Sequence, residues 1–477
     1  MSLGEYKRKR RFEKTPEPEG KLERKKTKQP RFVVQEHHAT SLHWDFRLER
    51  DGVLASWAVP KGIPADPKTN NLAVHVEDHP LDYIDFQGEI PEGSYGAGQV
   101  SVWDSGSYEE EKWSDREVKV VLHGKRLQGR YVLFQTRGKN WMIHRMDPPQ
   151  DPGWEPLPDR IEPMLATPAK AVPRDQQRYA FEFKWDGVRA TVYSRGGRVR
   201  LLSRSLEDIS ERYPELRGIG EQLGARDAVL DGEIIAVDEA GQPSFERLQR
   251  RMGLTAEGDV RRRMRDTPVF FMAFDVLHLE GHETMSRPYS ARRDLLERLR
   301  LKGPYWQTPP NSVDDAETMK EASVKAGMEG LVAKRLDSPY TPGRRSDAWL
   351  KIKNKRQQEL VIGGWLEGEG SRRGRIGALL LGVYDDAGRL VYAGKCGTGF
   401  TEKMLDRLAA LLQPLAASSS PFQAGAAPPR GAHFVEPALV AEVEFSEWTA
   451  GGQLRHPAFK GLRDDRDPKS VVREIPA

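Results

Sequence analysis

Short runs of alternating apolar and polar residues, separated by Gly and Pro, fill residues 30–147. A period of two marks half-buried strands, and it predicts them at Phe32-Val33-Val34, Leu42 to Leu48, Leu54 to Val59, Gln99 to Trp103, Val118 to Leu122, Gly129 to Gln135 and Trp141 to His144. Many short strands divided by turn residues are typical of a β-barrel or a β-sandwich. We therefore predict an all-β domain at 31–147.

The pattern changes after this domain. Proline-rich residues 148–162 predict a linker. Residues 163–356 mix strands with helical periodicity at Pro288–Leu301 and Asp314–Ala326. We expect a second domain, of mixed α and β structure, over this range.

A third domain is predicted at 357–477. The pattern indicates strands at Glu359–Trp365 and Ala378–Tyr384, an amphipathic helix near Glu402–Leu415, a loose loop at 417–431, a strand at Ala438–Phe445 and a basic tail. The whole chain is thus expected to be a multidomain, β-rich α+β protein.

Composition limits the number of domains and the cellular compartment that we expect for this protein. The 477 residues suffice for about three domains. One cysteine, Cys396, excludes a disulfide framework, and no apolar run approaches the roughly 18–20 residues of a membrane span. We expect a cytoplasmic protein that does not enter a membrane.

The net charge of +4 is unevenly placed, because residues 1–31 carry 12 Lys/Arg and 5 Asp/Glu while the remainder is slightly acidic. Residues 1–30 are therefore interpreted as a basic arm that contacts phosphates. A disordered, solubilising tail would have the same composition.

Lys184 lies in the run Phe181-Glu182-Phe183-Lys184-Trp185-Asp186-Gly187-Val188-Arg189, an alternating strand that ends in an Asp-Gly turn. A lysine held beside other cations can lose its proton and act as a nucleophile. A solvated surface lysine before a turn is the alternative.

The Lys-x-Asp-Gly pattern at Lys184 resembles motif I of the covalent nucleotidyltransferases, which include ATP-dependent DNA ligases, RNA ligases and capping enzymes. Further motifs of that family follow in order: Leu201–Arg204, Val229–Ile235, Phe270–Leu277, Met328–Lys334 and Trp349–Lys353. Six motifs in the family's order make a chance match very unlikely.

The resemblance implies ATP as cofactor, Mg²⁺ or Mn²⁺ as the metal, and Lys184 as the nucleophile that carries AMP. It implies that Glu233 and Glu329 hold the metal or, for Glu233, the ribose, and that Phe274 stacks on adenine. The remaining nucleotide contacts would come from Glu182, Arg189, Arg204, Arg345, Lys351 and Lys353. The alternatives are that Glu233 and Glu329 are ordinary strand-end carboxylates and that Phe274 is a core residue. Lys351 and Lys353 could instead lie on a solvated strand face, and Arg344 could take the place of Arg345.

The segment from about 358 resembles the OB-fold that follows this domain in DNA ligases. It should close over the nucleotide and follow the DNA backbone. Arg463 and Arg466 match motif VI, with arginine at 466 where the family has lysine. Arginine keeps the charge but changes its geometry.

In the N-terminal domain, His43, Asp45 and Arg47 alternate on one strand face, and His37 lies six residues upstream. Nitrogen and oxygen ligands without thiolate suit manganese or zinc, and the arginine suits a phosphate. His38 is the alternative to His37, and a solvated polar strand face is the plain alternative.

This stretch, with Leu54–Gly62 and Glu77–Tyr83, resembles the 3′-phosphoesterase domain of bacterial ligase D. The resemblance implies that His37, His43 and Asp45 bind Mn²⁺, and that further residues act on the phosphate: Arg47, Lys61, His79, Tyr83, Arg10 and Glu17. His75 and His123 are expected to be structural or surface residues. Arg11 and Asn71 depart from the family's aspartate and arginine, so we expect attenuated phosphoesterase activity.

The whole chain resembles a bacterial ligase D without its polymerase domain. The resemblance implies sealing of DNA ends or nicks in non-homologous end joining, near the nucleoid, with the Ku end-binding protein and a separate polymerase or primase as partners. An RNA ligase or capping enzyme, and a DNA-end tether with decayed sites, are the alternatives.

Overall fold

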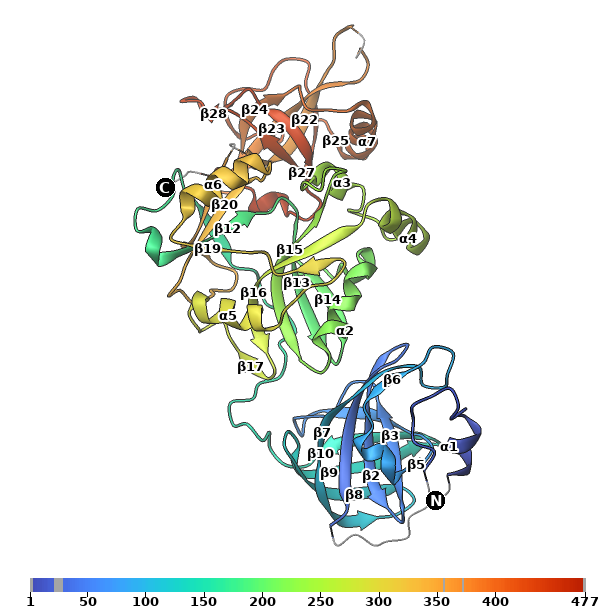
Figure 1. The fold of residues 1–477 in the computed structure, drawn as a ribbon. Helices are drawn as coiled ribbons and strands as arrows, with labels where there is room; N and C mark the ends of the chain where they lie inside the picture. Colours follow the sequence, from blue (N-terminus) through green and yellow to red (C-terminus); the bar gives the residue numbers. More distant parts are fainter. Residues whose placement is uncertain (1–2, 21–28, 355–356, 371–372, 475–477) are drawn as a thin grey trace.

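The computed structural model describes residues 3–20, 29–354, 357–370 and 373–474. Figure 1 shows a β-barrel joined by an extended linker to two further units. The barrel comes first in the sequence, and the last unit lies at the opposite end of the molecule. The expected order of three domains is therefore the order of the folded units.

The barrel is one sheet whose first and seventh strands pair, which closes it. Around it run β1 (Arg31–His38), β2 (Leu42–Arg50), β3 (Val53–Val59), β4 (Asn70–His75), β10 (Asn140–Arg145), β9 (Gln128–Arg137), β8 (Glu117–Gly124) and β7 (Gly98–Trp113). The short β5 (His79–Pro80) and β6 (Gly88–Ile90) add to β3 and β7, and a 3-10 helix, η1 (Leu81–Asp85), follows β5. All seven strands predicted for this domain are confirmed.

Alternate residues of these strands fill the barrel. Trp44, Phe46 and Trp57 are buried in its core, as the predicted alternation of β2 requires. The opposite set on β2 is not solvated either, because Asp45 and Arg47 are also buried. A buried polar face of this kind needs internal partners.

The start of the predicted basic arm is part of the barrel unit. Helix α1 (Gly4–Arg8) places Tyr6 in full burial, and the Tyr6 hydroxyl donates to the Pro18 carbonyl at 2.7 Å. The boundary expected at residue 31 therefore falls inside the first structural unit. Lys25, Lys26 and Lys28 lie outside the described residues.

The linker lies along the second unit. The Glu155 amide donates to the Gly281 carbonyl at 2.7 Å, His282 Nε2 lies 2.8 Å from Asp151, and the Ile161 amide donates to the Tyr193 hydroxyl at 2.6 Å. These bonds hold the proline-rich stretch in place over much of its length.

Two sheets form the second unit. One holds β11 (Leu165–Pro168), β21 (Arg345–Lys353), β20 (Gly330–Arg335), β12 (Tyr179–Lys184) and β19 (Ser312–Val313). The other holds β14 (Arg198–Ser203), β13 (Val188–Arg195), β15 (Ala228–Ala236), β16 (Val269–Leu279) and β17 (His282–Glu283), with β18 (Trp306–Gln307) paired to β16. The chain passes from the first sheet to the second through Trp185-Asp186-Gly187, immediately after Lys184.

Helices pack around these sheets: α2 (Gly218–Leu223), α3 (Phe245–Gln249), α4 (Glu257–Asp266), α5 (Tyr289–Arg298) and α6 (Ala316–Lys325). The last two confirm the helices predicted from periodicity. Short 3-10 turns lie at η2 (Gln176–Arg178), η3 (Ser210–Arg212) and η4 (Pro214–Arg217).

The third unit is an OB-fold domain around a seven-stranded sheet. Its strands are β25 (Ala416–Ala417), β27 (His433–Glu444), β22 (Gln357–Glu367), β23 (Ile376–Tyr384), β24 (Leu390–Cys396), β26 (Ala424–Gly425) and β30 (Ala458–Leu462). A hairpin of β28 (Glu447–Trp448) and β29 (Leu454–Arg455), helix α7 (Glu402–Leu412) and 3-10 turns η6 (Gln413–Leu415) and η7 (Pro468–Ser470) complete it. The loop expected at 417–431 contains β26 and part of β25.

Cys396 is fully buried in the core of this domain, and burial raises the pKa of its thiol to about 11. The thiol lies 3.4 Å from the Pro457 carbonyl. The residue behaves as a small core side chain.

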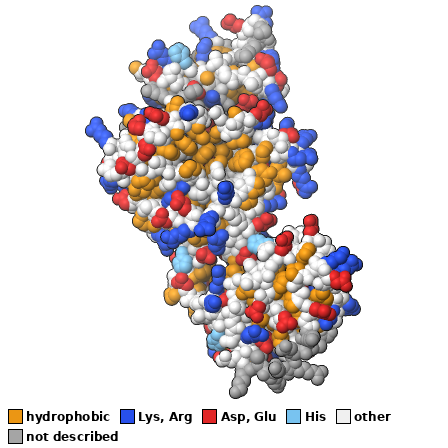
Figure 2. Space-filling model, in the orientation of Figure 1, with side chains coloured by type: hydrophobic (Ala, Val, Ile, Leu, Met, Phe, Trp, Pro, Cys, Tyr) orange, Lys and Arg blue, Asp and Glu red, His pale blue; other side chains and the backbone are white. Residues whose placement is uncertain are grey.

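The barrel touches the second unit along a narrow waist (Figure 2). The Ala225 amide donates to Glu36 at 3.3 Å. Leu42 packs closely against Gly197, because a Cβ added to Gly197 would lie 2.3 Å from the Leu42 side chain. Both barrel residues belong to the β1–β2 hairpin. Among the described residues, no helix combines the length and apolarity that a membrane crossing needs.

Candidate active sites

Strand pairing brings the motif residues of the second unit together. On β12, Lys184 lies opposite Gly330 of β20, and Gly330 lies opposite Lys353 of β21. A Cβ on Gly330 would lie 2.1 Å from the Ile352 carbonyl oxygen, so only glycine allows the two strands to approach this closely. The predicted nucleophile therefore faces the predicted phosphate-binding strand.

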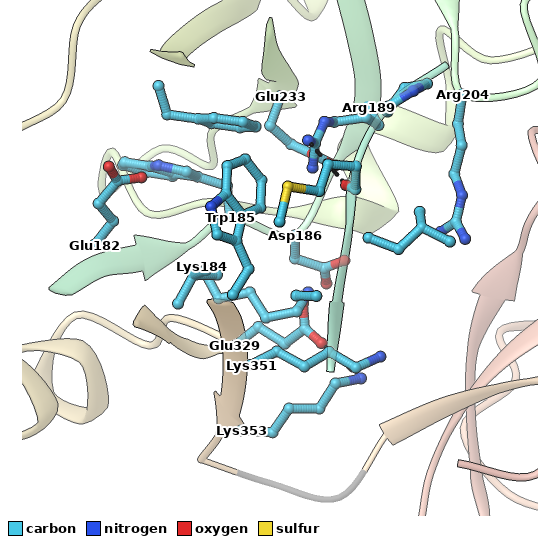
Figure 3. A pocket seen from close by; sticks show the side chains of 18 of the residues that line it. Glu182, Lys184, Trp185, Asp186, Arg189, Arg204, Glu233, Glu329, Lys351 and Lys353 are labelled. Carbon is cyan, nitrogen blue, oxygen red and sulfur yellow. Dashed lines mark hydrogen bonds and ion pairs between the residues drawn. The ribbon is translucent and has the colours of Figure 1, made fainter. Parts of the chain in front are cut away.

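The Glu329 carboxylate lies between two lysines (Figure 3). It accepts a hydrogen bond from Lys184, and its other oxygen lies 2.8 Å from the Lys353 ammonium. Burial opposes its charge, but the two ammonium groups outweigh burial and hold the pKa of Glu329 well below its usual range. Glu329 is thus an anion at neutral pH and a direct partner of the nucleophile.

Two more carboxyl groups face this cavity. Burial raises the pKa of Glu233 to about 7, although Arg189 and Lys184 oppose the shift. Burial and the Glu329 charge also raise the pKa of Asp186. With Glu329, these carboxyl groups offer the oxygen ligands that a divalent metal ion takes, so the cavity fits such an ion by donor type.

Every residue predicted for nucleotide binding lines this one cavity: Glu182, Lys184, Arg189, Arg204, Glu233, Phe274, Glu329, Arg345, Lys351, Lys353, Arg463 and Arg466. Lys351 and Lys353 point to the same side, as their period on β21 requires (Figure 3). Arg345 lines the cavity and its neighbour Arg344 does not, so the geometry favours Arg345.

Two of the residues predicted to bind the nucleotide already form bonds with other side chains of the protein. Arg189 forms a fork with Asp231 at 2.7 and 2.6 Å and lies 4.5 Å above the Phe274 ring. Glu182 is buried beside Lys334 at 2.8 Å and accepts a hydrogen bond from Tyr289. Both therefore anchor the walls of the cavity as well as lining it.

Lys334 is the main residue that the sequence prediction left without a role. Its ammonium is buried, donates to the Phe274 carbonyl at 3.1 Å and lies 4.3 Å from the Phe274 ring centroid and 4.4 Å from that of Trp349. Lys334 is the last residue of motif IV, and that position was the signal in the sequence that could have identified it. Phe274 is packed in the core and also lines the cavity, so stacking on adenine stays a prediction.

The C-terminal domain supplies one wall of the cavity. Arg463 forms a fork with Asp465 at 2.9 Å for both bonds, and Arg466 Nε lies 2.9 Å from Glu359. Glu474 pairs with Lys351. The arrangement is closed, with each of these cations held by a carboxylate of the C-terminal domain.

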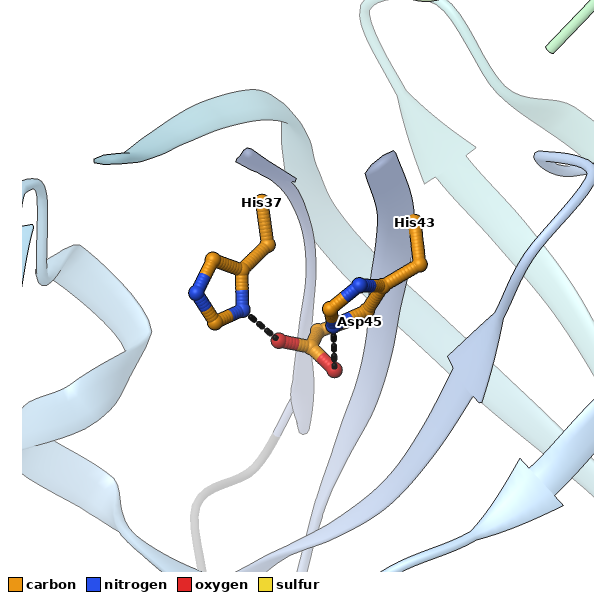
Figure 4. Close-up of side chains that lie close together, drawn as sticks. All are labelled: His37, His43 and Asp45. Atoms are coloured by element: carbon orange, nitrogen blue, oxygen red, sulfur yellow. Dashed lines mark ion pairs between the residues drawn. The ribbon is translucent and has the colours of Figure 1, made fainter. Parts of the chain in front are cut away.

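The barrel holds a second cluster (Figure 4). His37 Nδ1 and His43 Nε2 lie 3.5 and 3.8 Å from the two oxygens of Asp45, and one ligand atom from each residue falls within 4.8 Å of the others. The β1–β2 register places His37 directly opposite His43. Three such donors can share one ion with bonds of about 2.1 Å.

Both imidazoles are oriented by carbonyls, since His37 Nε2 lies 2.9 Å from the Gly96 oxygen and His43 Nδ1 3.0 Å from that of Ser41. Such bonds fix the tautomer that presents the other nitrogen to a metal. His38 instead faces Glu36 at 2.7 Å, so the geometry selects His37.

Arg47 connects the cluster to the rest of the barrel. Its guanidinium donates to Asp45 at 2.9 Å, Gln35 at 2.8 Å and Ser56 at 2.9 Å, and lies 2.7 Å from His79 Nδ1. Burial opposes the charge of Asp45, but Arg47 and the imidazoles hold its pKa below its usual range. Gln35 and Ser56 were missed, although the strand period places both on the face of Asp45.

Arg10 and Glu17 reach this site from the N-terminal segment. Arg10 donates to Glu17 at 2.7 Å and Glu77 at 3.0 Å and lies 3.3 Å from His79 Nε2, while Tyr83 donates to Glu17 at 3.1 Å. Burial, with Arg47 and Arg10 alongside, holds the pKa of His79 well below its usual value. Glu77 was missed, although it lies two residues before His79.

Family models divide the chain as the structure does. Residues 35–135 match the DNA ligase D 3′-phosphoesterase domain, 163–353 the ATP-dependent DNA ligase domain, and 372–466 the ATP-dependent DNA ligase C-terminal region. The chain is 41% identical to a solved mycobacterial DNA ligase D complexed with ATP and MES, covering 98% of that chain and 66% of this one, with a TM-score of 0.49. The chain belongs to the DNA ligase D family.

Full-length ligase D proteins extend beyond the matched region. The chain is 45% identical over 478 residues to a multifunctional non-homologous end joining protein LigD of Mycobacterium bovis, and 39% identical over 535 residues to that of Pseudomonas aeruginosa. It spans 61% and 62% of those two proteins, while they cover 99% and 100% of this chain.

Three residues singled out from the sequence of this domain have no contact with the cluster of His37, His43 and Asp45. Lys61, predicted to act on the phosphate, is exposed, and its side chain forms no hydrogen bond or ion pair within the described parts of the chain. Asn71 is buried and donates to the Gly62 carbonyl at 2.7 Å, so it holds the turn that follows β3. Arg11 is exposed.

Two histidines have the structural or surface roles expected of them. His75 packs against the rings of Trp57 and Trp141, with centroids 5.2 and 6.0 Å away. His123 is exposed and lies 3.1 Å from Glu109.

Proposed function

We propose that this chain seals DNA strand breaks with ATP and trims the 3′ ends it joins. The observation that carries the proposal is the single cavity in which Lys184, its partner Glu329 and the lysines of β21 meet the arginines of the C-terminal domain. Two arginines, two lysines and a nucleophile on one cavity suit a triphosphate.

The reaction would begin when neutral Lys184 Nζ attacks the α-phosphorus of ATP. A P–N bond forms, the bond to the β-phosphate oxygen breaks, and pyrophosphate leaves. The Lys184 ammonium would first lose a proton to solvent, and the Glu329 carboxylate, which stays ionised, would orient the neutral Nζ through the hydrogen bond between them. A divalent ion bound by Glu233 and Glu329 would supply charge neutralisation at the phosphates.

AMP would then pass from Lys184 to a 5′-phosphate at the break, and attack by a 3′-hydroxyl would release it. Arg463 and Arg466 are placed to bind the leaving pyrophosphate of the first step, because they line the cavity from the closing domain. Arginine at 466 gives that contact the forked geometry of a guanidinium.

The barrel would remove a 3′-phosphate or a 3′-ribonucleoside from the same substrates. His37, His43 and Asp45 fit a metal by donor type and spacing, and manganese is the ion we propose there. Arg47 and Arg10, with the imidazole of His79 between them, form a cationic cluster beside it that would hold the phosphate. Sealing fails on a blocked 3′ end, which gives the two sites a common purpose.

The relatives' names point to end joining, and on that basis we propose broken DNA ends as substrates, near the nucleoid, with Ku and a separate polymerase or primase as partners.

The linker holds the barrel close to the ligase unit. Its residue Trp154 packs on Gly281 of the ligase unit, where a Cβ added to Gly281 would lie 2.0 Å from the Trp154 ring.

Labelling with α-³²P-ATP and Mg²⁺ tests the first step. We expect a covalent adenylate on the wild type and on Lys325→Ala, an exposed lysine on α6, and none on Lys184→Ala. A wild-type chain that never takes label would remove the ligase proposal.

Substrate choice separates the alternatives. Faster sealing of nicked DNA than of nicked RNA supports a DNA ligase, and the reverse order supports an RNA ligase. Binding to DNA ends with neither labelling nor sealing would indicate a tether. Manganese-dependent loss of a 3′-phosphate, abolished by His43→Ala, tests the barrel separately.

A further inference from the structure

Tyr95 is an exposed aromatic residue at the rim of the barrel site. Its side chain is 49% exposed, unlike the buried tyrosines Tyr6 and Tyr83 nearby. It lies in the loop between β6 and β7, in the run Gly93-Ser94-Tyr95-Gly96. Two turn bonds hold this loop, from the Ser94 amide to the Pro91 carbonyl at 3.1 Å and from the Ala97 amide to the Ser94 carbonyl at 3.2 Å.

The loop is tied to the metal cluster by its next residue. The Gly96 carbonyl lies 2.9 Å from His37 Nε2, and a Cβ on Gly96 would be 3.7 Å from the His37 ring. Tyr95 is therefore adjacent in sequence to the group that orients a predicted metal ligand. This bond holds the backbone next to Tyr95 against the cluster.

Cations lie under and beside the ring. The Lys9 ammonium lies 4.6 Å from the ring centroid and donates to the Tyr95 hydroxyl at 3.3 Å, and the Arg10 guanidinium lies 5.6 Å from the centroid. Glu77 holds both cations, at 2.9 Å from Lys9 and 3.0 Å from Arg10. Because Arg10 also reaches His79, one chain of contacts joins Tyr95 to the phosphate-binding surface.

An exposed aromatic face beside a lysine is the pair that binds single-stranded nucleotides, the ring by stacking on a base and the cation by contact with a phosphate. Solvent exposure of a large ring gains nothing for folding. Tyr95 lies beside the barrel site, in a loop held by turn bonds, and next to the cations Lys9 and Arg10. These features together indicate that a ligand binds at the Tyr95 ring.

We propose that Tyr95 stacks on the base of the nucleotide at the 3′ end and that Lys9 contacts the phosphate on its 5′ side. This subsite rests on the proposed phosphoesterase function of the barrel. It is independent of base identity, because every base has a flat face. It would hold the end nucleotide while the scissile phosphate lies at the metal cluster.

Steady-state kinetics of 3′-phosphate removal with Mn²⁺ would measure the contribution. Tyr95→Ala should raise KM about tenfold and leave kcat within about twofold, since stacking on one base contributes to binding rather than to chemistry. Tyr95→Phe and Tyr95→Trp should retain most of the affinity. Leu72→Ala, which truncates another exposed apolar residue of the barrel, is the matched control.

A binding measurement separates this subsite from the phosphoesterase itself. A duplex with 2-aminopurine as its last 3′ base should lose fluorescence on binding wild type or His43→Ala, which cannot cleave, and keep it with Tyr95→Ala. Persistent quenching with Tyr95→Ala would overturn the proposal whether or not the barrel is active. Equal KM increases for Tyr95→Phe and Tyr95→Ala would also overturn it, because they would assign the effect to the hydroxyl.

Discussion

The two sites of this chain are assembled in different ways. The barrel site takes its residues from Arg10 to Tyr83, within one folded unit, and neighbouring strands fix its cluster of His37, His43 and Asp45. The cavity around Lys184 takes residues up to Glu474 and is complete only when the C-terminal domain lies over it. One site is built by folding, and the other is built by the closing of one domain on another.

The difference extends to how each site satisfies its charges. Around Arg47 every partner belongs to the barrel. In the ligase cavity, the carboxylates of Glu359 and Glu474 hold Arg466 and Lys351, cations proposed to bind phosphate. A triphosphate bound to these cations would have to displace these carboxylates, so we expect ATP binding to be coupled to movement of the C-terminal domain.

The largest expected effect comes from disabling each site alone. Removing the charge of Glu329 takes away the partner of Lys184, so Glu329→Gln should slow adenylate formation about 10²–10³-fold. His43→Ala should lower 3′-phosphate removal at least about 10²-fold, because it removes a proposed metal ligand. Each variant should keep the other activity within about twofold. Loss of both activities in either variant would contradict the separation of the two sites.

A smaller effect should follow from releasing Lys351. Glu474→Gln removes the carboxylate that occupies this lysine, so the KM for ATP in adenylate formation should fall about threefold to tenfold. Glu436→Gln, on the exposed side of β27, should leave it unchanged. A KM that rises in Glu474→Gln would show that the carboxylate supports ATP binding.

The smallest effect concerns pH. Burial and the neighbouring Glu359 raise the pKa of Glu442 from 4.5 to about 8, so the folded chain binds this proton more tightly than the unfolded chain. Stability from this group therefore falls as pH rises from 4.5 and levels off above 8. Between pH 6 and 9, the wild-type Tm should fall relative to that of Glu442→Gln by about 2–4 °C. Parallel Tm curves for the two proteins would contradict this assignment.

The sequence predicted the ligase cavity well because its motifs lie on strands whose period and pairing are regular. Lys351 and Lys353 share a face for that reason, and the Lys184 strand was read from its alternation. Glu474 was not predicted, because nothing in the local pattern of a chain end indicates which distant lysine it contacts.

In the barrel, the strands and the shared face of His43, Asp45 and Arg47 followed from alternation. The packing of residues 3–20 did not, because composition alone describes that segment as basic and solvated. Arg10 and Glu17 became interpretable only through a resemblance. Glu77 holds Arg10 across a gap in sequence that no periodic pattern spans.

The burial of Cys396 has a practical consequence for following the domain motion. A thiol with a raised pKa and no exposed surface reacts slowly with maleimide dyes. Cysteines introduced at exposed positions of α6 and α7 can therefore be labelled in the otherwise native chain. Energy transfer between the two dyes would then test whether the C-terminal domain moves relative to the second unit when ATP is added.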